Sequence, residues 1–365
     1  MAGWLVVWCM RRAYMKSRLF ALFVASAAWA AGMAGPAAAQ PPDAATAGAS
    51  FACDGSMCAA GGDGNCVGPG LFDACGCGPI WQVRANLIWL HRSKPNDAQL
   101  ATDFTPGGVL LLDAAEFRFE YETGPEIAIL HRVNDRWDIE GRFFRVDGWN
   151  ARRNAVFALG SEVQYTPPFG DAFFPATIAG SYRAQLNNVE VNGRRKINDG
   201  WSLLAGFRYL GHDEELRIEQ DFGPGFLAVA HDIRAANGLY GFQLGVDTTL
   251  WSRGRLGLEG VCKAGVFANQ ASQRVHIGAA TSPISYHSSA AKSAAAFAGE
   301  FGLTGVFRLT PRLAVRGGYQ FLWIAGLVQA SDQVAASNPI AGTAAIAFTG
   351  NPTYDGAFVG LELSR

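Results

Sequence analysis

The stretch 239–269 alternates between two kinds of residue. Its even positions from 240 to 250 are mostly large and apolar, and its odd positions hold Gly, Gln, Asp and Thr. After a short turn at Ser252-Arg253-Gly254, the same alternation resumes. A period of two is typical of a β-strand with one apolar and one polar face. The stretch therefore predicts a hairpin of two long strands.

The length of these two strands favours a membrane protein. Each has a dozen or more residues, whereas strands of soluble proteins average about five or six. A tilted strand needs about 9–11 residues to cross a bilayer. We expect the apolar face to contact lipid and the polar face to line an aqueous lumen. The alternative is a soluble β-sandwich in which the aromatic side chains pack between two sheets.

The composition agrees with a membrane β-barrel. Hydrophobic residues make up 49% of the 365 residues, but only 17% are charged, below the roughly 25% of ordinary soluble domains. After position 40, no apolar run is long enough for a transmembrane helix. Moderate hydrophobicity distributed by alternation is typical of outer-membrane barrels.

Residues 1–39 have the pattern of a signal peptide. A basic segment, Met15–Arg18, precedes the apolar segment Leu19–Ala31, and Ala37-Ala38-Ala39 fits an A-x-A cleavage site. The alternative is an uncleaved anchor helix. The segment contains four basic residues and no acids, so its removal lowers the formal net charge from −1 to −5. This mild acidity gives no reason to expect a nucleic-acid partner.

Residues 40–79 predict a flexible periplasmic leader, because they are rich in Ala, Gly, Pro and Asp and offer little to bury. Disulfides are the default use of thiols in an oxidising compartment. Because the leader has an odd number of cysteines, one is left to cross-link an envelope protein or a second copy. The spacing lacks a paired C-x2-C, so we predict no metal site, although metal binding is a third alternative. The disulfide candidates are Cys53, Cys58, Cys66, Cys75 and Cys77.

Residues 80–365 predict an all-β domain, a closed antiparallel up-and-down transmembrane β-barrel of about ten strands, with twelve as the alternative. Two bulges are expected, at Thr123-Gly124-Pro125 and at Asn187-Asn188, where the alternation changes phase. Strands are expected at 80–92, 116–133, 136–148, 182–195, 200–212, 239–251, 255–269, 297–308, 313–323 and 356–364.

The connections between these strands alternate in length. Two- or three-residue turns alternate with long segments at 93–115, 149–181, 213–237, 270–295 and 327–354. Short periplasmic turns and long external loops are typical of barrels in the bacterial outer membrane. The pattern places both the leader and the C-terminus in the periplasm. Trp and Tyr near the strand ends predict aromatic girdles at the two interfaces.

Recognisable motifs occur in the segments 75–79, 186–192, 204–210 with Asp213-Glu214, 237–245, 263–269 and 318–323. Together they resemble the planctomycete-type outer-membrane β-barrel proteins, which are usually described as porin-like or pore-forming. The resemblance covers roughly residues 75–365 and implies an outer-membrane location, a barrel and a porin-like role, but no catalytic residues. One difference is the end Leu363-Ser364-Arg365, which lacks the terminal aromatic residue common in such barrels.

Charged residues predicted to face the lumen are the candidate functional residues. Acids and bases on facing walls can form a selectivity filter. In a narrow barrel, the same residues would instead pair into a layer that does not conduct. The candidates are Glu140, Arg142, Arg208, Asp247, Glu259, Lys263, Glu300, Arg316 and Glu362.

Three functions remain open on the sequence. The first is passive diffusion of small hydrophilic solutes. The second is a non-conducting structural barrel that is cross-linked through its leader. The third, an outer-membrane lipid hydrolase, needs a Ser or Thr beside a His at the outer lipid rim, and no motif points to one. We therefore expect neither an enzyme nor a cofactor. The segment 212–215, His-Asp-Glu-Glu, is either a solvated acidic loop or a divalent-cation site.

Overall fold

The computed structural model describes residues 79–103, 110–156, 163–165, 177–221, 229–279 and 285–365. The predicted signal peptide and the five leader cysteines lie outside the described residues. The described part divides into strands with two short helical turns. None of its helices is long and apolar enough to cross a membrane.

Ten antiparallel strands close into one ring, which confirms the predicted up-and-down transmembrane barrel. Each strand pairs with its predecessor and its successor among the ten, and the first pairs with the last. In ring order they are β1 (Trp81–Arg92), β15 (Thr353–Ser364), β12 (Leu313–Ala325), β11 (Ser285–Arg308), β10 (Leu256–Ala279), β9 (Val229–Arg253), β8 (Trp201–Asp221), β7 (Thr177–Asn198), β5 (Trp137–Val156) and β4 (Glu122–Arg132).

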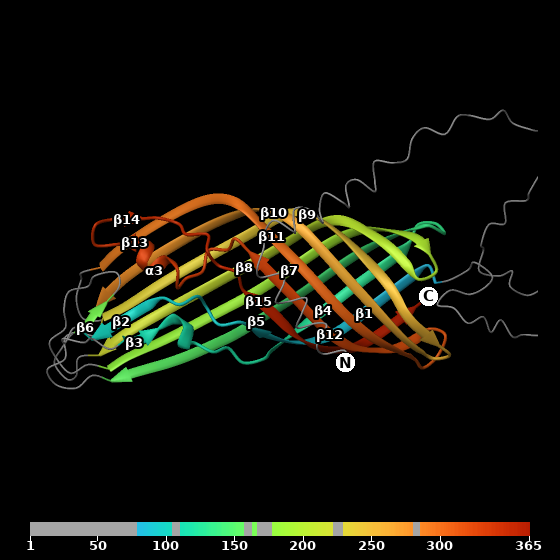
Figure 1. Cartoon of the computed structure of the whole chain (residues 1–365), viewed down its shortest axis with the longest axis horizontal. Helices are drawn as coiled ribbons and strands as arrows, with labels where there is room; N and C mark the ends of the chain where they lie inside the picture. Colours follow the sequence, from blue (N-terminus) through green and yellow to red (C-terminus); the bar gives the residue numbers. More distant parts are fainter. Residues whose placement is uncertain (1–78, 104–109, 157–162, 166–176, 222–228, 280–284) are drawn as a thin grey trace, which may run out of the picture. The chain divides into compact units, whose positions relative to one another are not determined.

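The strands fall into a short group and a long group. The neighbouring strands β4, β1, β15 and β12 have 11–13 residues each. The other six have 20–25 residues each. In Figure 1 the long strands continue well beyond the short ones, away from the end with the tight turns. All ten strands therefore form the barrel wall at the turn end, whereas only the six long strands form it at the other end.

Much of the sequence predicted as long loops is in fact strand. The described residues of the segments 149–181, 213–237 and 270–295 mostly extend β5, β7, β8, β9, β10 and β11. The reason is visible in β8, where the apolar side chains change faces. Near the turns, Leu203 and Phe207 point outward and are exposed, whereas further along Leu216 and Ile218 point inward and are buried. Because the outward residues of this outer half are polar, the sequence resembles a loop.

Neither predicted bulge is observed, and the same change of face explains the absence of the one predicted at Asn187-Asn188. Asn187 and Asn188 pair with their neighbours on β5 and β8 without a register shift. Val189 is exposed on the outer face and Leu186 is buried on the inner face, so the phase change is a change of environment and not an inserted residue. Thr123-Gly124-Pro125 also pairs regularly with β1. The register shifts recorded among the ten barrel strands lie between Asp147 and Trp149, between Lys196 and Asn198, and between Leu258 and Glu259.

Two connections between short strands fold against the inner face of the long strands. The first inner segment (residues 93–103 and 110–121) contains β2 (Gln99–Asp103), β3 (Leu110–Asp113) and η1 (Ala114–Glu116). The second inner segment (residues 326–352) contains α3 (Gln333–Ala336), β13 (Ser337–Asn338) and β14 (Thr343–Ala344). A further strand, β6 (Val163–Tyr165), joins β2 and β3 in a separate sheet.

The outer surface near the turns carries an apolar band. Trp137, Trp201 and Trp251 are exposed at the turn ends of their strands. Tyr209 lies eight residues beyond Trp201, Tyr240 lies eleven residues from Trp251, and their rings are 4.9 Å apart on the same outer face. These aromatic positions agree with the predicted girdles at the two membrane interfaces.

Candidate functional site

The structure places all nine predicted lumen residues on the inner face of the barrel. Together with four further charged residues, they form two groups at different heights along the barrel axis. We call the group near the turn end the mouth layer, and it consists of Arg84, Glu140, Arg194, Asp247, Glu259, Arg316 and Glu362. We call the next group the central layer, and it consists of Glu126, Arg142, Glu190, Arg208, Lys263 and Glu300.

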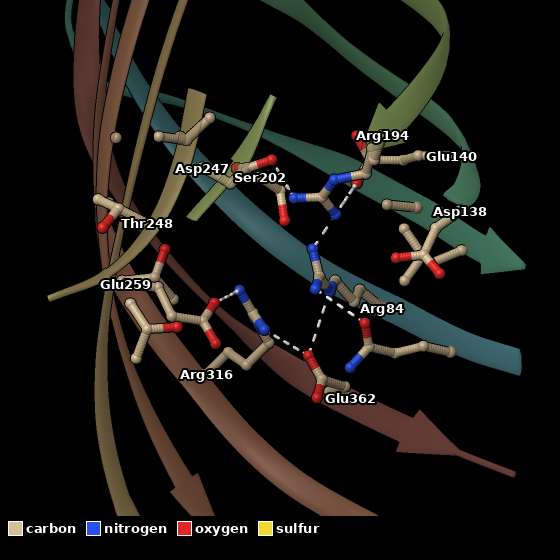
Figure 2. Close-up of a pocket in the computed structure, with 18 of the residues that line it drawn as sticks. Arg84, Asp138, Glu140, Arg194, Ser202, Asp247, Thr248, Glu259, Arg316 and Glu362 are labelled. Carbon is tan, nitrogen blue, oxygen red and sulfur yellow. Dashed lines mark hydrogen bonds and ion pairs between the residues drawn. The ribbon is translucent and has the colours of Figure 1, made fainter. Parts of the chain in front are cut away.

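In the mouth layer, arginines bridge carboxylates from different strands (Figure 2). The Arg316 guanidinium donates to Glu259 at 2.8 Å and also to Glu362, which accepts from Arg84 at 3.1 Å. Across the lumen, Arg194 donates to Glu140 at 2.9 Å and to Asp247. These residues line a cavity of about 440 Å³ that is bordered by the tight turns. The cavity makes the mouth layer accessible from the turn end.

In the central layer, three cations face three carboxylates. Arg142 donates to Glu126 at 2.6 Å, to Glu190 at 3.1 Å and to Glu300. Arg208 and Lys263 lie against the same two glutamates, with Arg208 2.8 Å from Glu300 and Lys263 2.8 Å from Glu190. The residues come from β4, β5, β7, β8, β10 and β11, so the ion pairs connect strands across the lumen as well as along the wall.

Little solvent reaches the central layer, although Glu126, Arg142, Lys263 and Glu300 also line the cavity at the turn end. The exposed fraction is 1% for Glu190 and Arg208, 5% for Lys263 and 6% for Glu300. Burying unpaired charges costs several kcal/mol each, so such a layer is stable only when it is fully paired. The equal number of cations and carboxylates satisfies that condition. Of the two arrangements predicted for these charges, the structure therefore shows the paired one.

Beyond the central layer, the interior is an apolar core. Buried side chains of the long strands pack against the first inner segment, where the rings of Phe117 and Phe119 lie 5.7 and 5.5 Å from that of Tyr182. Trp149 is fully buried, and its Nε1 donates to the carbonyl of Leu90 at 3.0 Å. This part of the interior is therefore filled with buried apolar side chains, as in a soluble protein, and is not lined with water.

One buried ion pair lies within this apolar core. Arg92 of β1 pairs with Glu214 of β8, and both side chains are fully buried. The Tyr182 hydroxyl and the backbone N–H of Ala330 also donate to Glu214, at 2.5 and 2.8 Å. Because Ala330 belongs to the second inner segment, this carboxylate connects that segment to both sides of the barrel.

Further side chains of the long strands bind the second inner segment through its backbone. Asn237 accepts from the N–H of Val328 and donates to its carbonyl, both at 2.8 Å. Gln273 donates to the carbonyl of Ala345 at 2.7 Å. Within the segment, Asp332 accepts from the Thr349 hydroxyl at 2.5 Å, and burial raises the pKa of its carboxyl above the ordinary 3.8. The segment is therefore a fixed part of the interior.

The segment 212–215 is neither a loop nor a cation site. It lies inside β8, so its side chains alternate between the two faces. His212 and Glu214 are buried in the barrel, whereas Asp213 and Glu215 point outward. The four groups cannot therefore converge on one ion. Within the described residues, no group of three or more His, Cys, Asp or Glu side chains is arranged to bind a metal.

Sequence reasoning missed several members of the network. Arg84 and Glu126 occupy inner positions of strands whose outer faces are clearly apolar, so the alternation alone would identify them. Glu190 and Arg194 lie just beyond the bulge predicted at Asn187-Asn188, in a segment where no residues were assigned to the inner face. No sequence signal paired Arg92 with Glu214, since they are 122 residues apart.

No family model matches this sequence, and no curated protein matches it. Among solved structures, the chain is similar to the outer membrane protease OmpT from Escherichia coli, at 12% identity over 78% of this chain and 96% of that chain, with a TM-score of 0.46. It is also similar to the translocator domain of autotransporter NalP from Neisseria meningitidis, at 9% identity over 79% and 89% of the two chains, with a TM-score of 0.35. The toluene transporter TbuX from Ralstonia pickettii matches at 9% identity over 79% and 89%, with a TM-score of 0.31. At these values the similarity assigns no function.

Proposed function

We propose that this protein is an outer-membrane barrel with a closed lumen, which acts as a structural component of the cell envelope. The observation that carries the proposal is the burial of the central layer. Side chains that line a water-filled pore are in contact with water, yet those of Glu190 and Arg208 are 1% exposed. An ion or solute crossing the barrel would have to separate buried ion pairs and displace the packed core beyond them.

Support for the outer membrane comes from the apolar band, the aromatic residues at its edges and the even number of strands. The predicted signal peptide and the tight turns at one end agree with this location. Membership of the porin-like family stays a prediction from sequence resemblance.

Electrical conductance of the refolded full chain in planar bilayers tests the closed lumen. We expect no single-channel steps, and liposomes that contain the protein should exclude small sugars. As a control, a variant that combines alanine at the six central-layer positions with replacement of residues 328–349 by a two-residue Asn-Gly turn should leak more than the parent, because it removes both the central layer and the second inner segment. Stable steps from the parent protein would contradict the proposal and restore the passive-diffusion function predicted from the sequence.

A structural role also needs a connection to other envelope components. The five leader cysteines are the candidates predicted for that connection, and they lie outside the described residues. Within the described part, Cys262 is a free thiol on the exposed outer face of β10. Non-reducing gels of envelope extracts should therefore show a ladder of cross-linked species that collapses with reductant. The ladder should persist in Cys262→Ser and disappear when all five leader cysteines are replaced by serine.

A further inference from the structure

A groove of about 980 Å³ lies on the outer face of the long strands, beyond the apolar band. Its lining residues come from β5, β7, β8, β9, β10 and β11. Ala236, Ser272 and Ala291, which are paired neighbours on three adjacent strands, supply small side chains to its floor. Longer polar side chains border this floor. The groove is therefore a hollow on the outside of the barrel, separate from the lumen.

Three arginines lie in one row across the groove. Arg183 is paired in register with Glu215, Glu215 with Arg234, and Arg234 with Arg274. Arg234 donates to Glu215 at 2.8 Å. Within the described part of the chain, neither Arg183 nor Arg274 has an ion-pair partner. Like charges directly opposite each other on neighbouring strands are destabilising. An anion bound between Arg234 and Arg274 would remove that repulsion.

The side of the groove nearer the membrane offers hydrogen-bond acceptors. The Gln185 amide donates to Asp213 at 2.6 Å, and Asp147 lies on the neighbouring strand, paired in register with Gln185. Asp147 also pairs with Arg145 at 3.0 Å. Each of these carboxylates keeps further lone pairs that can accept hydrogen bonds from hydroxyl groups. The groove thus combines guanidinium groups that suit phosphate with acceptors that suit a polyhydroxylated ligand.

The height of the arginine row above the aromatic girdle distinguishes between classes of membrane lipid. Arg234 lies six residues beyond Tyr240 on β9, which is about 20 Å along the strand and about 15 Å in height at a tilt of roughly 40°. A phospholipid headgroup layer is only about 5–8 Å thick. A phospholipid anchored beside the aromatic girdle would therefore end below the arginines, whereas a lipid with an oligosaccharide headgroup would reach them.

We propose that this groove binds the phosphorylated oligosaccharide headgroup of a glycolipid in the adjacent membrane leaflet. Arg183, Arg234 and Arg274 bind the phosphate groups, and Asp147 and Asp213 accept hydrogen bonds from sugar hydroxyls. The site is continuous with the apolar band, so the acyl chains lie against the barrel while the headgroup occupies the groove. The inference rests on the outer-membrane location but not on whether the lumen is closed.

The test compares the detergent-purified full chain with two double variants. Arg183→Gln with Arg274→Gln removes the two arginines without partners. The control, Arg152→Gln with Arg217→Gln, removes two outward arginines on β5 and β8, strands that also line the groove. Both arginines lie one row further from the membrane and outside the groove lining. Binding is titrated with rough-type lipopolysaccharide, with its delipidated oligosaccharide and with phosphatidylglycerol, and bound lipids are counted by native mass spectrometry.

We expect the groove variant to bind lipopolysaccharide about tenfold or more weakly than the parent, since two charge-assisted hydrogen-bonding groups are lost. The control variant should bind as the parent does, and phosphatidylglycerol binding should be the same for all three proteins. Equal lipopolysaccharide binding by all three would overturn the proposal. So would an equal loss of phosphatidylglycerol binding in the groove variant, or oligosaccharide affinity as high as that of the intact glycolipid.

Discussion

The two halves of this barrel have opposite polarity. In the half near the turns, the outer face is apolar and the inner face is charged, as Leu203 and Arg208 on β8 illustrate. In the other half, the inner face is apolar and the outer face is charged, as Ile218 and Arg217 on the same strand illustrate. The backbone is a continuous strand in both halves. The difference shows that the surrounding solvent, lipid or water, decides which face of one strand is apolar.

The interiors of the two halves are also filled by different groups. The half with the apolar outer band contains paired charges, and the other half contains the apolar side chains of the two inner segments packed against the strands. Substitutions at matched positions should therefore have different effects in the two halves.

The largest effect is expected at the central layer. Arg142→Gln leaves Glu126, Glu190 and Glu300 with only two buried cations, and we expect a loss of about 3–5 kcal/mol in the free energy of unfolding. The matched substitution Arg145→Gln, at an exposed outward position three residues along β5, should change it by less than about 0.5 kcal/mol. Guanidinium unfolding in detergent micelles measures both. Equal effects would contradict the role assigned to the central layer.

A comparable loss is expected in the apolar core. Trp149→Ala removes a fully buried ring and its hydrogen bond to Leu90, so we expect about 3–5 kcal/mol of destabilisation. Circular dichroism, which does not depend on this tryptophan, is the suitable measurement. Trp137→Ala, at an exposed position on the same strand, serves as the control and should cost much less. If both variants lose the same amount of free energy of unfolding, the apolar core contributes less to stability than its packing implies.

A smaller effect is expected on the outer face, where β11 offers a matched pair. Leu303→Arg places a charge in the middle of the apolar band and should cost about 2–4 kcal/mol in lipid vesicles. Ser293→Arg, at an exposed outward position ten residues away, should be close to neutral. Equal costs at the two positions would show that the band does not end between them.

The smallest effect concerns pH. Because burial raises the pKa of Asp332 above 3.8, the folded state binds this proton more tightly than the unfolded state does. The contribution of this carboxyl to stability is therefore greatest below pH 3.8 and decreases as the pH rises through the raised pKa. In Asp332→Asn, the free energy of unfolding should no longer show this decrease as the pH rises. An unchanged pH profile in the variant would show that Asp332 is not responsible.

Much of the barrel can be predicted from the alternation of apolar and polar residues alone. The turn ends of most strands, the number of strands and the inner position of all nine predicted charges follow from a period of two combined with an apolar outer face. The extension of β7 and β8 beyond the band does not, because the rule that apolar means outward fails where water replaces lipid. Pairing of the lumen charges was one of the two alternatives predicted for them, but the packed interior beyond them was not predictable, since it depends on contacts such as Ala330 with Glu214 between distant segments.

The most direct test of the opposite polarity is a nitroxide scan of outward positions on β7 in lipid vesicles, with the native cysteines replaced. Single cysteines at Val191, Val189, Gln185 and Arg183 would carry the label. We predict that labels at the two valines are accessible to dissolved oxygen, and that labels at Gln185 and Arg183 are accessible to a water-soluble nickel chelate. Uniform accessibility to either reagent along the strand would contradict the account.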